Sequence, residues 1–167
     1  MSVTFREPDL ILADILTHEM NLDAARVVVY DENWEPPKDK GLYLIIQTGP
    51  TEIIGSTSIF NPSTNTEEPG VACVQTLQVN VTSRNRTALQ RKEEVVMALT
   101  SSYSQSIQEA QQVKITREGP IQDLSFIEGA SALHRYQVPV KIFYVKLKTQ
   151  DVSVIDGFPD PQIVEEA

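Results

Sequence analysis

QTLQVNVTSRNRTALQRKEEVVMALTSSYSQSI, residues 75–107, predicts a β-strand that runs almost directly into the longest helix of the chain. Near the start of this segment apolar and polar side chains alternate with a period of two, which is typical of a half-buried strand. One face carries Val71, Cys73, Leu77, Val79 and Val81, and the other carries Ala72, Thr76, Gln78, Asn80 and Thr82. We expect the first face to lie in the core and the second to face water.

Polar residues 82–85 follow this strand, and Ser83 or Asn85 can serve as the N-cap of a helix. From there the apolar positions follow the 3.6-residue period of an amphipathic helix. These positions are Leu89, Val96, Leu99, Tyr103, Ile107 and Ala110. The pattern predicts one long helix that lies across the sheet.

The composition predicts one soluble domain. The chain has 167 residues, of which 41% are hydrophobic, and it has no apolar run of membrane length. Its first residues are acidic, unlike a secretory signal or a transit peptide, so we expect a protein that stays in the cytoplasm in which it is made. The single cysteine, Cys73, cannot form an intramolecular disulfide, and we interpret it as a small buried hydrophobe.

The formal charge of −9 argues against a protein that binds nucleic acid tightly, because phosphate binding depends on clustered Lys and Arg. Much of this charge lies at the C-terminus, where residues 149–167 contain no basic residue. The acidic residues there are Asp151, Asp156, Asp160, Glu165 and Glu166. The folded body is therefore only mildly acidic.

PDLILADILTHEM, residues 8–20, predicts a first helix with Pro8 near its N1 position and Asp9 in its first turn. Its apolar side consists of Leu10 or Ile11, Ile15, and His18 or Leu22. His18 and Glu19 suggest a zinc-protease helix, but that motif needs a second His where Leu22 stands. With two His and one Cys in the chain, we predict neither a metal site nor a cofactor.

Residues 25–30 predict a short strand, and DENWEPPKDKG, residues 31–41, predicts an extended loop. Trp34 in this loop either packs back onto the domain or anchors an interface. Residues 42–47 and 52–60 then predict a hairpin with a turn at residues 48–51. We expect residues 61–70, NPSTNTEEPG, to form a long polar loop with Glu67 and Glu68 at its tip, a projection suited to contact with a neighbour.

Beyond the long helix, residues 113–117 and 124–127 flank a turn and predict a small hairpin. The strongest strand starts at His134, and its apolar face is Tyr136, Val138, Val140, Ile142 and Tyr144. Pro139 removes one backbone donor, which predicts an open side or a bulge. Residues 149–167 combine acidic residues with large apolar ones, including Val154, Ile155 and Phe158, and predict an extended arm that docks on a partner, for which another copy of the chain is one candidate.

No catalytic constellation is found. The chain lacks a GxSxG elbow, a GxxxxGK[ST] phosphate loop, a GxGxxG turn and paired cysteines. We interpret His134 as a surface or strand-end residue, because no local motif places a Ser, Cys or carboxylate beside it. The sequence therefore favours a non-enzymatic protein, with an active site assembled from distant residues as the alternative.

Two segments carry a resemblance to a known family: LQVNVTSRNRTALQRKEEVVMAL, residues 77–99, and HRYQVPVKIFYV, residues 134–145. The order of helix, strand, proline-containing loop and strands, followed by these segments, is similar to the neck or tail terminator proteins of tailed bacteriophages. In that family a strand ends in a polar kink, a helix packs on the sheet, and a late strand begins with an Arg, here Arg135. The resemblance covers residues 10–148, and the arm lies outside it.

This resemblance implies a virion structural protein that forms a ring, usually a homohexamer. The ring terminates the tail tube and joins the tail to the head connector in the neck. The implied partners are further copies of the chain, the tail tube protein and the head-tail connector or adaptor, with the sheath protein as a further candidate. The implied setting is a virion assembled in the cytoplasm of a bacterial host, with no membrane contact, and DNA would pass through the ring without specific binding. Alternatives are another tail, baseplate or head-completion component, or a small enzyme or ligand-binding domain.

Taken together, these patterns predict an α+β fold with two layers. A mixed, mostly antiparallel sheet in residues 1–148 is packed on one face by the long helix and the N-terminal helix, and residues 149–167 form the arm. A cyclic head-to-tail ring needs two complementary surfaces on each subunit. We predict that basic residues of the long helix and its start meet acidic residues of the loop and arm. The candidate interface residues are Trp34, Glu67, Glu68, Arg84, Arg86, Arg91, Lys92, Val154, Ile155 and Phe158.

Overall fold

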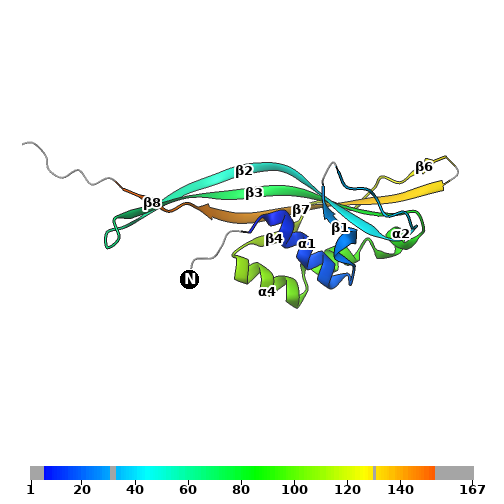
Figure 1. Cartoon of the computed structure of the whole chain (residues 1–167), viewed down its shortest axis with the longest axis horizontal. Helices are drawn as coiled ribbons and strands as arrows, with labels where there is room; N and C mark the ends of the chain where they lie inside the picture. Colours follow the sequence, from blue (N-terminus) through cyan, green and yellow to red (C-terminus); the bar gives the residue numbers. More distant parts are fainter. Residues whose placement is uncertain (1–5, 31–32, 130, 153–167) are drawn as a thin grey trace, which may run out of the picture.

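The computed structural model describes residues 6–30, 33–129 and 131–152, which form an α+β fold around a mixed sheet (Figure 1). Along the sheet the strand order is β1-β2-β3-β7-β4, and β1 is parallel to β2 while the other pairs are antiparallel. The strands are β1 (Val27–Val29), β2 (Tyr43–Asn61), β3 (Thr66–Ser83), β4 (Lys114–Arg117), β5 (Gln122–Asp123), β6 (Phe126–Glu128), β7 (Ser131–Leu147) and β8 (Gln150–Asp151). The predicted class and the mixed sheet are confirmed.

The central strand is β3, which pairs with β2 along one edge and with β7 along the other. The apolar face predicted for it is buried: Leu77, Val79 and Val81 are fully enclosed. On the neighbouring strands, buried side chains stand opposite these three residues. They are Leu44 and Ile46 of β2 and Tyr136, Val138 and Val140 of β7. Three aligned rows of aliphatic and aromatic side chains therefore form the sheet's half of the core.

Helices cover one face of the sheet (Figure 1). They are α1 (Pro8–Glu19), a 3-10 turn η1 (Ala24–Arg26), α2 (Thr87–Arg91), α3 (Glu94–Leu99) and α4 (Ser102–Gln111). Pro8 starts α1 as predicted, and four residues of this helix are fully enclosed against the sheet and α3. These are Ile11, Leu12, Ile15 and Leu16. His18 lies outside the core and stacks on Tyr103 of α4, with ring centroids 3.7 Å apart.

The prediction of one long helix over residues 89–110 is wrong, because three shorter helices replace it. Thr100 ends α3, and Ser101 has extended backbone angles while its side-chain oxygen accepts a hydrogen bond from the Ser104 N–H at 3.0 Å. Ser101 is thus an N-cap inside the predicted helix, and it starts a new helix in a different direction. The interruption between α2 and α3 is slight, since Lys92 and Glu93 keep right-handed helical angles.

The N-cap of α2 is Arg86, which makes no side-chain cap hydrogen bond, so neither of the predicted N-caps, Ser83 or Asn85, holds that position. Both side chains nevertheless accept hydrogen bonds from backbone N–H groups of the first helical turn. The Ala88 N–H donates to Ser83 Oγ at 2.9 Å, and the Thr87 N–H donates to Asn85 Oδ1 at 2.9 Å. Ser83 in turn donates to the Asn85 carbonyl at 2.6 Å and is fully buried. These bonds fix the angle at which the chain leaves β3 and enters the helical layer.

The predicted hairpin over residues 42–60 is also wrong, because these residues form one strand, β2. The pairing with β3 passes from Thr48 opposite Leu77 to Thr51 opposite Gln75, so Gly49 and Pro50 form a bulge. Gly49 lies so close to β3 that a Cβ atom there would be 2.8 Å from the Thr76 carbonyl oxygen. The Gly-Pro pair therefore bends the strand without reversing it.

The chain reverses later, in a turn at residues 62–65, where Asn65 has a positive φ of 54°. The long loop predicted over residues 61–70 is thus a tight turn between two paired strands. Glu67 and Glu68 are not at a loop tip but lie within β3, opposite Phe60 and Ile59. The polar composition of residues 61–70 predicted a loop, but most of these residues belong to the ends of β2 and β3.

The hairpin predicted around residues 118–120 is absent from the described chain, because β4, β5 and β6 each pair with β7 and not with one another. Pro139 lies in β7 where β4 has ended and β5 has not begun. Its carbonyl accepts from the Glu118 N–H at 2.8 Å on that same side. The missing Pro N–H therefore falls at an open stretch of the strand, as predicted.

Candidate functional site

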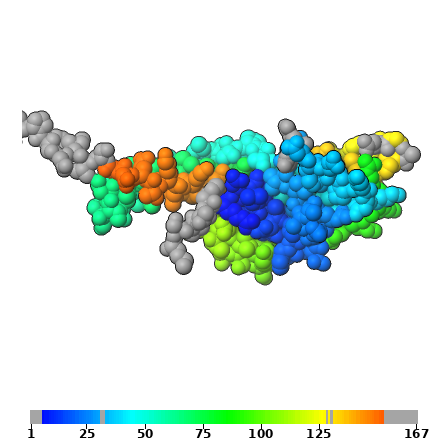
Figure 2. All heavy atoms as spheres, viewed as in Figure 1, coloured from blue at the N-terminus to red at the C-terminus, as the bar shows by residue number. Residues whose placement is uncertain are grey.

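The largest feature without a covering layer is a three-stranded extension of the sheet, formed by residues 51–75 and 143–152. It runs past the end of the helical layer and makes the molecule elongated (Figures 1 and 2). β8 continues the line of β7 and pairs with Thr66 and Glu67 beside the turn. The Asn65 side chain donates to the Val152 carbonyl at 2.8 Å, which fastens the last described residue to the turn.

Apolar side chains are exposed on both faces of this extension. Given the pairing register, Ile53 and Phe60 point to the side on which the helices lie. Ile59 and the exposed apolar residues of β7 point to the opposite side. Ile53 is 64% exposed and Phe60 is 54% exposed. The exposed residues of β7 here are Phe143, Val145 and Leu147. An exposed apolar patch of this kind is typical of a protein interface.

Both edges of the extension are open among the described residues. β1 pairs with β2 only at residues 44–46, and β4 pairs with β7 only as far as Phe143. The outer backbone groups of residues 51–61 and 144–147 therefore have no neighbouring strand in the described chain. Long open edges can template pairing with another chain, so they form a second kind of interaction surface.

The predicted acidic and basic residues lie at opposite ends of β3. Glu67 and Glu68 are near its start, at the tip of the extension, and Arg84 and Arg86 follow its end. An 18-residue strand separates the two groups by roughly 55 Å. Within the extension Glu67 is hydrogen-bonded to Ser58, and Glu68 accepts from Thr149 at 3.2 Å. Within one chain, the acidic pair and the basic pair are therefore too far apart to interact.

The four predicted basic residues do not form one surface. Arg84 and Arg86 are exposed, but Arg91 donates to the Met20 carbonyl at 2.6 Å and to Glu94 at 2.6 Å. The Lys92 ammonium is 2.5 Å from Glu93 and lies over the Tyr136 ring. Arg91 and Lys92 therefore hold the helices against one another and against β7. The predicted arm residues Val154, Ile155 and Phe158 lie outside the described part of the chain.

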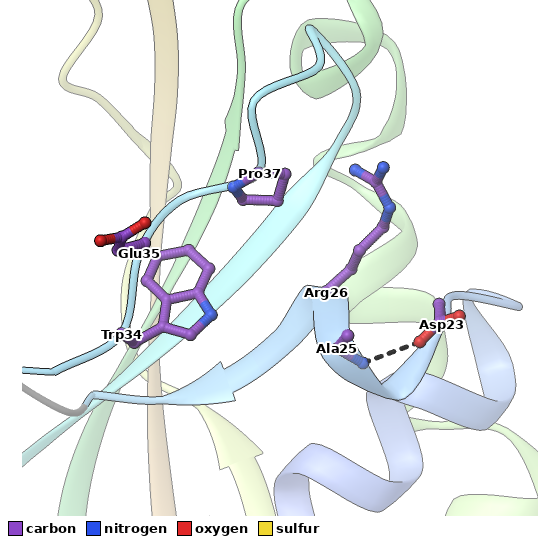
Figure 3. Close-up of a pocket in the computed structure, with 6 residues that line it drawn as sticks. All are labelled: Asp23, Ala25, Arg26, Trp34, Glu35 and Pro37. Carbon is purple, nitrogen blue, oxygen red and sulfur yellow. Dashed lines mark hydrogen bonds between the residues drawn. The ribbon is translucent and has the colours of Figure 1, made fainter.

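Trp34 packs back onto the domain, with its ring 5.5 Å from that of Tyr43 at a tilt of 53°. Together with Pro37 it forms one side of a shallow hollow of about 440 Å³, and Ala25 and Arg26 form the other (Figure 3). The Arg26 guanidinium is hydrogen-bonded to Asp39 and holds the pKa of that carboxyl below its usual range, with help from the Gly41 N–H. Ion pairing anchors this loop, and no nucleophile and base are paired among the described residues that line the hollow.

The face of β3 that we expected to be wet is partly buried. Asn80 is 1% exposed: it donates to Gln47 Oε1 at 3.1 Å and accepts from Arg135 Nε at 3.0 Å. Because Gln47 and Arg135 come from the strands on either side, their long side chains cover Asn80. Sequence alternation located these polar residues on one face but could not show that they bond across three strands.

The described residues contain no cluster of three His, Cys, Asp or Glu side chains that could hold a metal ion. None of the described helices is both long and apolar enough to cross a lipid bilayer. The exposed apolar residues of the extension were not predicted as site residues, although runs such as Ile53-Ile54 and Ile59-Phe60 are visible in the sequence. Comparison of the sequence with protein-family models and with curated proteins finds no match.

Proposed function

We propose that this protein is a structural subunit that assembles with further copies of itself into a closed ring. The observation that carries the proposal is the extension, with apolar side chains on both faces and two open edges. A monomer would leave this surface in water, where it favours association. The described residues contain no other element that could cover it, so a neighbouring subunit is the natural partner.

The arrangement suits head-to-tail contacts, in which two different surfaces of each subunit meet. The two open edges belong to different strands, β2 and β7, and lie on opposite sides of the extension. Arg86 and the acidic Glu67 and Glu68 are likewise at opposite ends of the subunit. Each open edge can therefore pair with the next copy in a cycle and not within the same copy.

More specifically, we propose a tail terminator in the neck of a tailed-phage virion. The support is the resemblance of residues 10–148 to that family, together with an assembly surface that an isolated domain would not need. In this proposal the unit is a two-layer domain, residues 1–148, with an arm at residues 149–167. The ring, of six copies as in the family, contacts the tail tube protein and the head-tail connector, with the sheath protein as a further candidate partner.

The test is the mass of the purified full-length protein, measured by light scattering behind a sizing column over a concentration series. We expect a species several times the 18.7 kDa mass of the chain, or a monomer that assembles when tail tubes are added. Ile59→Asp should weaken this assembly without unfolding the domain, because Ile59 is an exposed residue of the extension. Ser56→Asp places the same charge at an exposed polar position of β2 on the other face of the sheet and is the control for charge alone.

A strict monomer that ignores tail tubes would contradict the proposal and would favour a ligand-binding or enzymatic domain. Equal effects of Ile59→Asp and Ser56→Asp would show that charge on β2, and not loss of apolar contact, disturbs assembly. Circular dichroism of both variants separates an assembly defect from a folding defect.

A further inference from the structure

A second hollow lies where the helical layer ends and the extension begins. It has a volume of about 330 Å³, and its lining comes from β2, β3, β7 and the segment that links α4 to β4. Residues that line it include Ile54, Cys73, Val113, Lys114, Phe143 and Tyr144. Burial raises the pKa of the Tyr144 hydroxyl, with Cys73 as a further contributor.

The charge on the lining of this hollow is basic. Lys114 belongs to the lining, and no carboxylate does. The hollow therefore offers an apolar centre next to one ammonium group. A peptide that combines large apolar residues with carboxylates would match it.

The chain contains such a peptide in residues 153–167, SVIDGFPDPQIVEEA. Four carboxylates alternate there with large apolar residues, and no Lys or Arg is present. Five residues supply the apolar side chains, namely Val154, Ile155, Phe158, Ile163 and Val164. The charge and the apolar content are thus complementary to the hollow.

The direction of the chain at Val152 favours the hollow of another copy over the segment's own hollow. β7 and β8 run toward the turn at residues 62–65, and Val152 is bonded to Asn65 there, so the chain is heading away from the helical layer. About seven residues of β3, or roughly 23 Å, separate Thr66 from Cys73. Fifteen residues can reach about 50 Å, but entering its own hollow would require the segment to reverse direction completely.

We propose that residues 153–167 of one copy dock in this hollow of a second copy, with Val154, Ile155 or Phe158 near Cys73 and the carboxylate of Asp156 or Asp160 facing Lys114. The inference rests on the proposed self-assembly and names the contact that links neighbouring subunits. It gives the C-terminal segment the role of a tether that joins each subunit to the next.

The single cysteine makes this contact testable by disulfide cross-linking of the full-length protein. Val154, Ile155 and Phe158 are replaced by Cys one at a time, so that each variant carries the native Cys73 and one new thiol. Because a disulfide needs Cβ atoms about 4 Å apart, a cross-link to the mostly buried Cys73 reports entry into the hollow. Glu166→Cys, near the end of the segment, is the matched control.

Under mild oxidation we expect at least one of the three variants to form covalent multimers, at least five-fold more than Glu166→Cys. These multimers should disappear on reduction and when Cys73→Ser is added. A disulfide within one chain, seen as loss of both thiols at monomer mass, would overturn the inference, since the segment would then dock on its own subunit. Cross-linking no greater than in the control would overturn it as well.

Light scattering of the reduced protein separates this inference from the proposed function. A ring-sized species without Cys73 cross-links would support the proposed ring and contradict the docking contact. A monomer at all concentrations, with or without tail tubes, would contradict the ring itself. Multimers that form only through Cys73 in an otherwise monomeric protein would support the docking contact without the ring.

Discussion

At the scale of single residues, the core of the helical layer depends on which side chains of α3 face the sheet. Leu99 is 5% exposed and belongs to the main core cluster, whereas Met97, two residues earlier, is 65% exposed. We predict that Leu99→Ala lowers the free energy of unfolding by about 2 to 5 kcal/mol, because it leaves a cavity. Met97→Ala should change it by less than about 0.5 kcal/mol. Urea unfolding followed by circular dichroism measures both.

A similar cost for the two variants would mean that the orientation of α3 is wrong. The sequence placed Leu99 in the core but also projected one apolar stripe through Tyr103 to Ala110. The break at Thr100 and Ser101 resets the helical phase, so Ser104 is buried in α4 and donates to the Leu99 carbonyl at 3.0 Å. Periodicity predicts which residues face inward only as far as the helix itself continues.

At the scale of elements, the bulge at Gly49 and Pro50 lets one strand serve both the body and the extension. We predict that Gly49→Ala lowers the free energy of unfolding by about 1 to 3 kcal/mol, since its Cβ would press against the Thr76 carbonyl oxygen and the strand would have to shift. Gly55→Ala is the matched control in the same strand, because its Cβ would meet only the Ala72 Cβ at 4.0 Å. Thermal unfolding of both variants compares them directly.

If Gly55→Ala cost as much as Gly49→Ala, loss of glycine from β2 and not the close approach would explain the effect. The bulge was not predictable from residues 48–51 alone, since a Gly-Pro pair is typical of turns and of strand irregularities alike. What distinguishes them is β3, whose 18 residues pair with β2 on both sides of the bulge. That information lies more than twenty residues away along the chain.

At the scale of the whole molecule, the net charge of −9 bears on the DNA that would pass through the proposed ring. We predict that duplex DNA binds weakly, with little change in affinity between low and moderate salt, because few phosphates would be neutralised. Fluorescence anisotropy with labelled duplex at two salt concentrations measures this. Tight binding that falls steeply with added salt would contradict a passage that lets DNA slide.

The fold class and the buried faces of β3 and β7 could be predicted because their alternation is imposed by a core on one side. The extension could not be predicted in this way, because neither face of residues 51–61 is buried in the described structure. No core therefore requires apolar and polar side chains to alternate there. Apolar residues then occur in adjacent pairs, such as Ile53-Ile54, which resemble no single strand pattern. The part of the site that escaped prediction is therefore the part that the core of the described residues does not enclose.

The continuous run of β3 from the tip to the body also has a mechanical consequence. Because β3 is bonded on both edges, a pull on the tip along the strand would load its ladder bonds together in shear, not one after another as in peeling. The last described residue is fastened beside that same tip. Tension applied through the C-terminal segment would thus reach the body along the most resistant axis of the sheet, as the proposed role of joining a tail to a head would require.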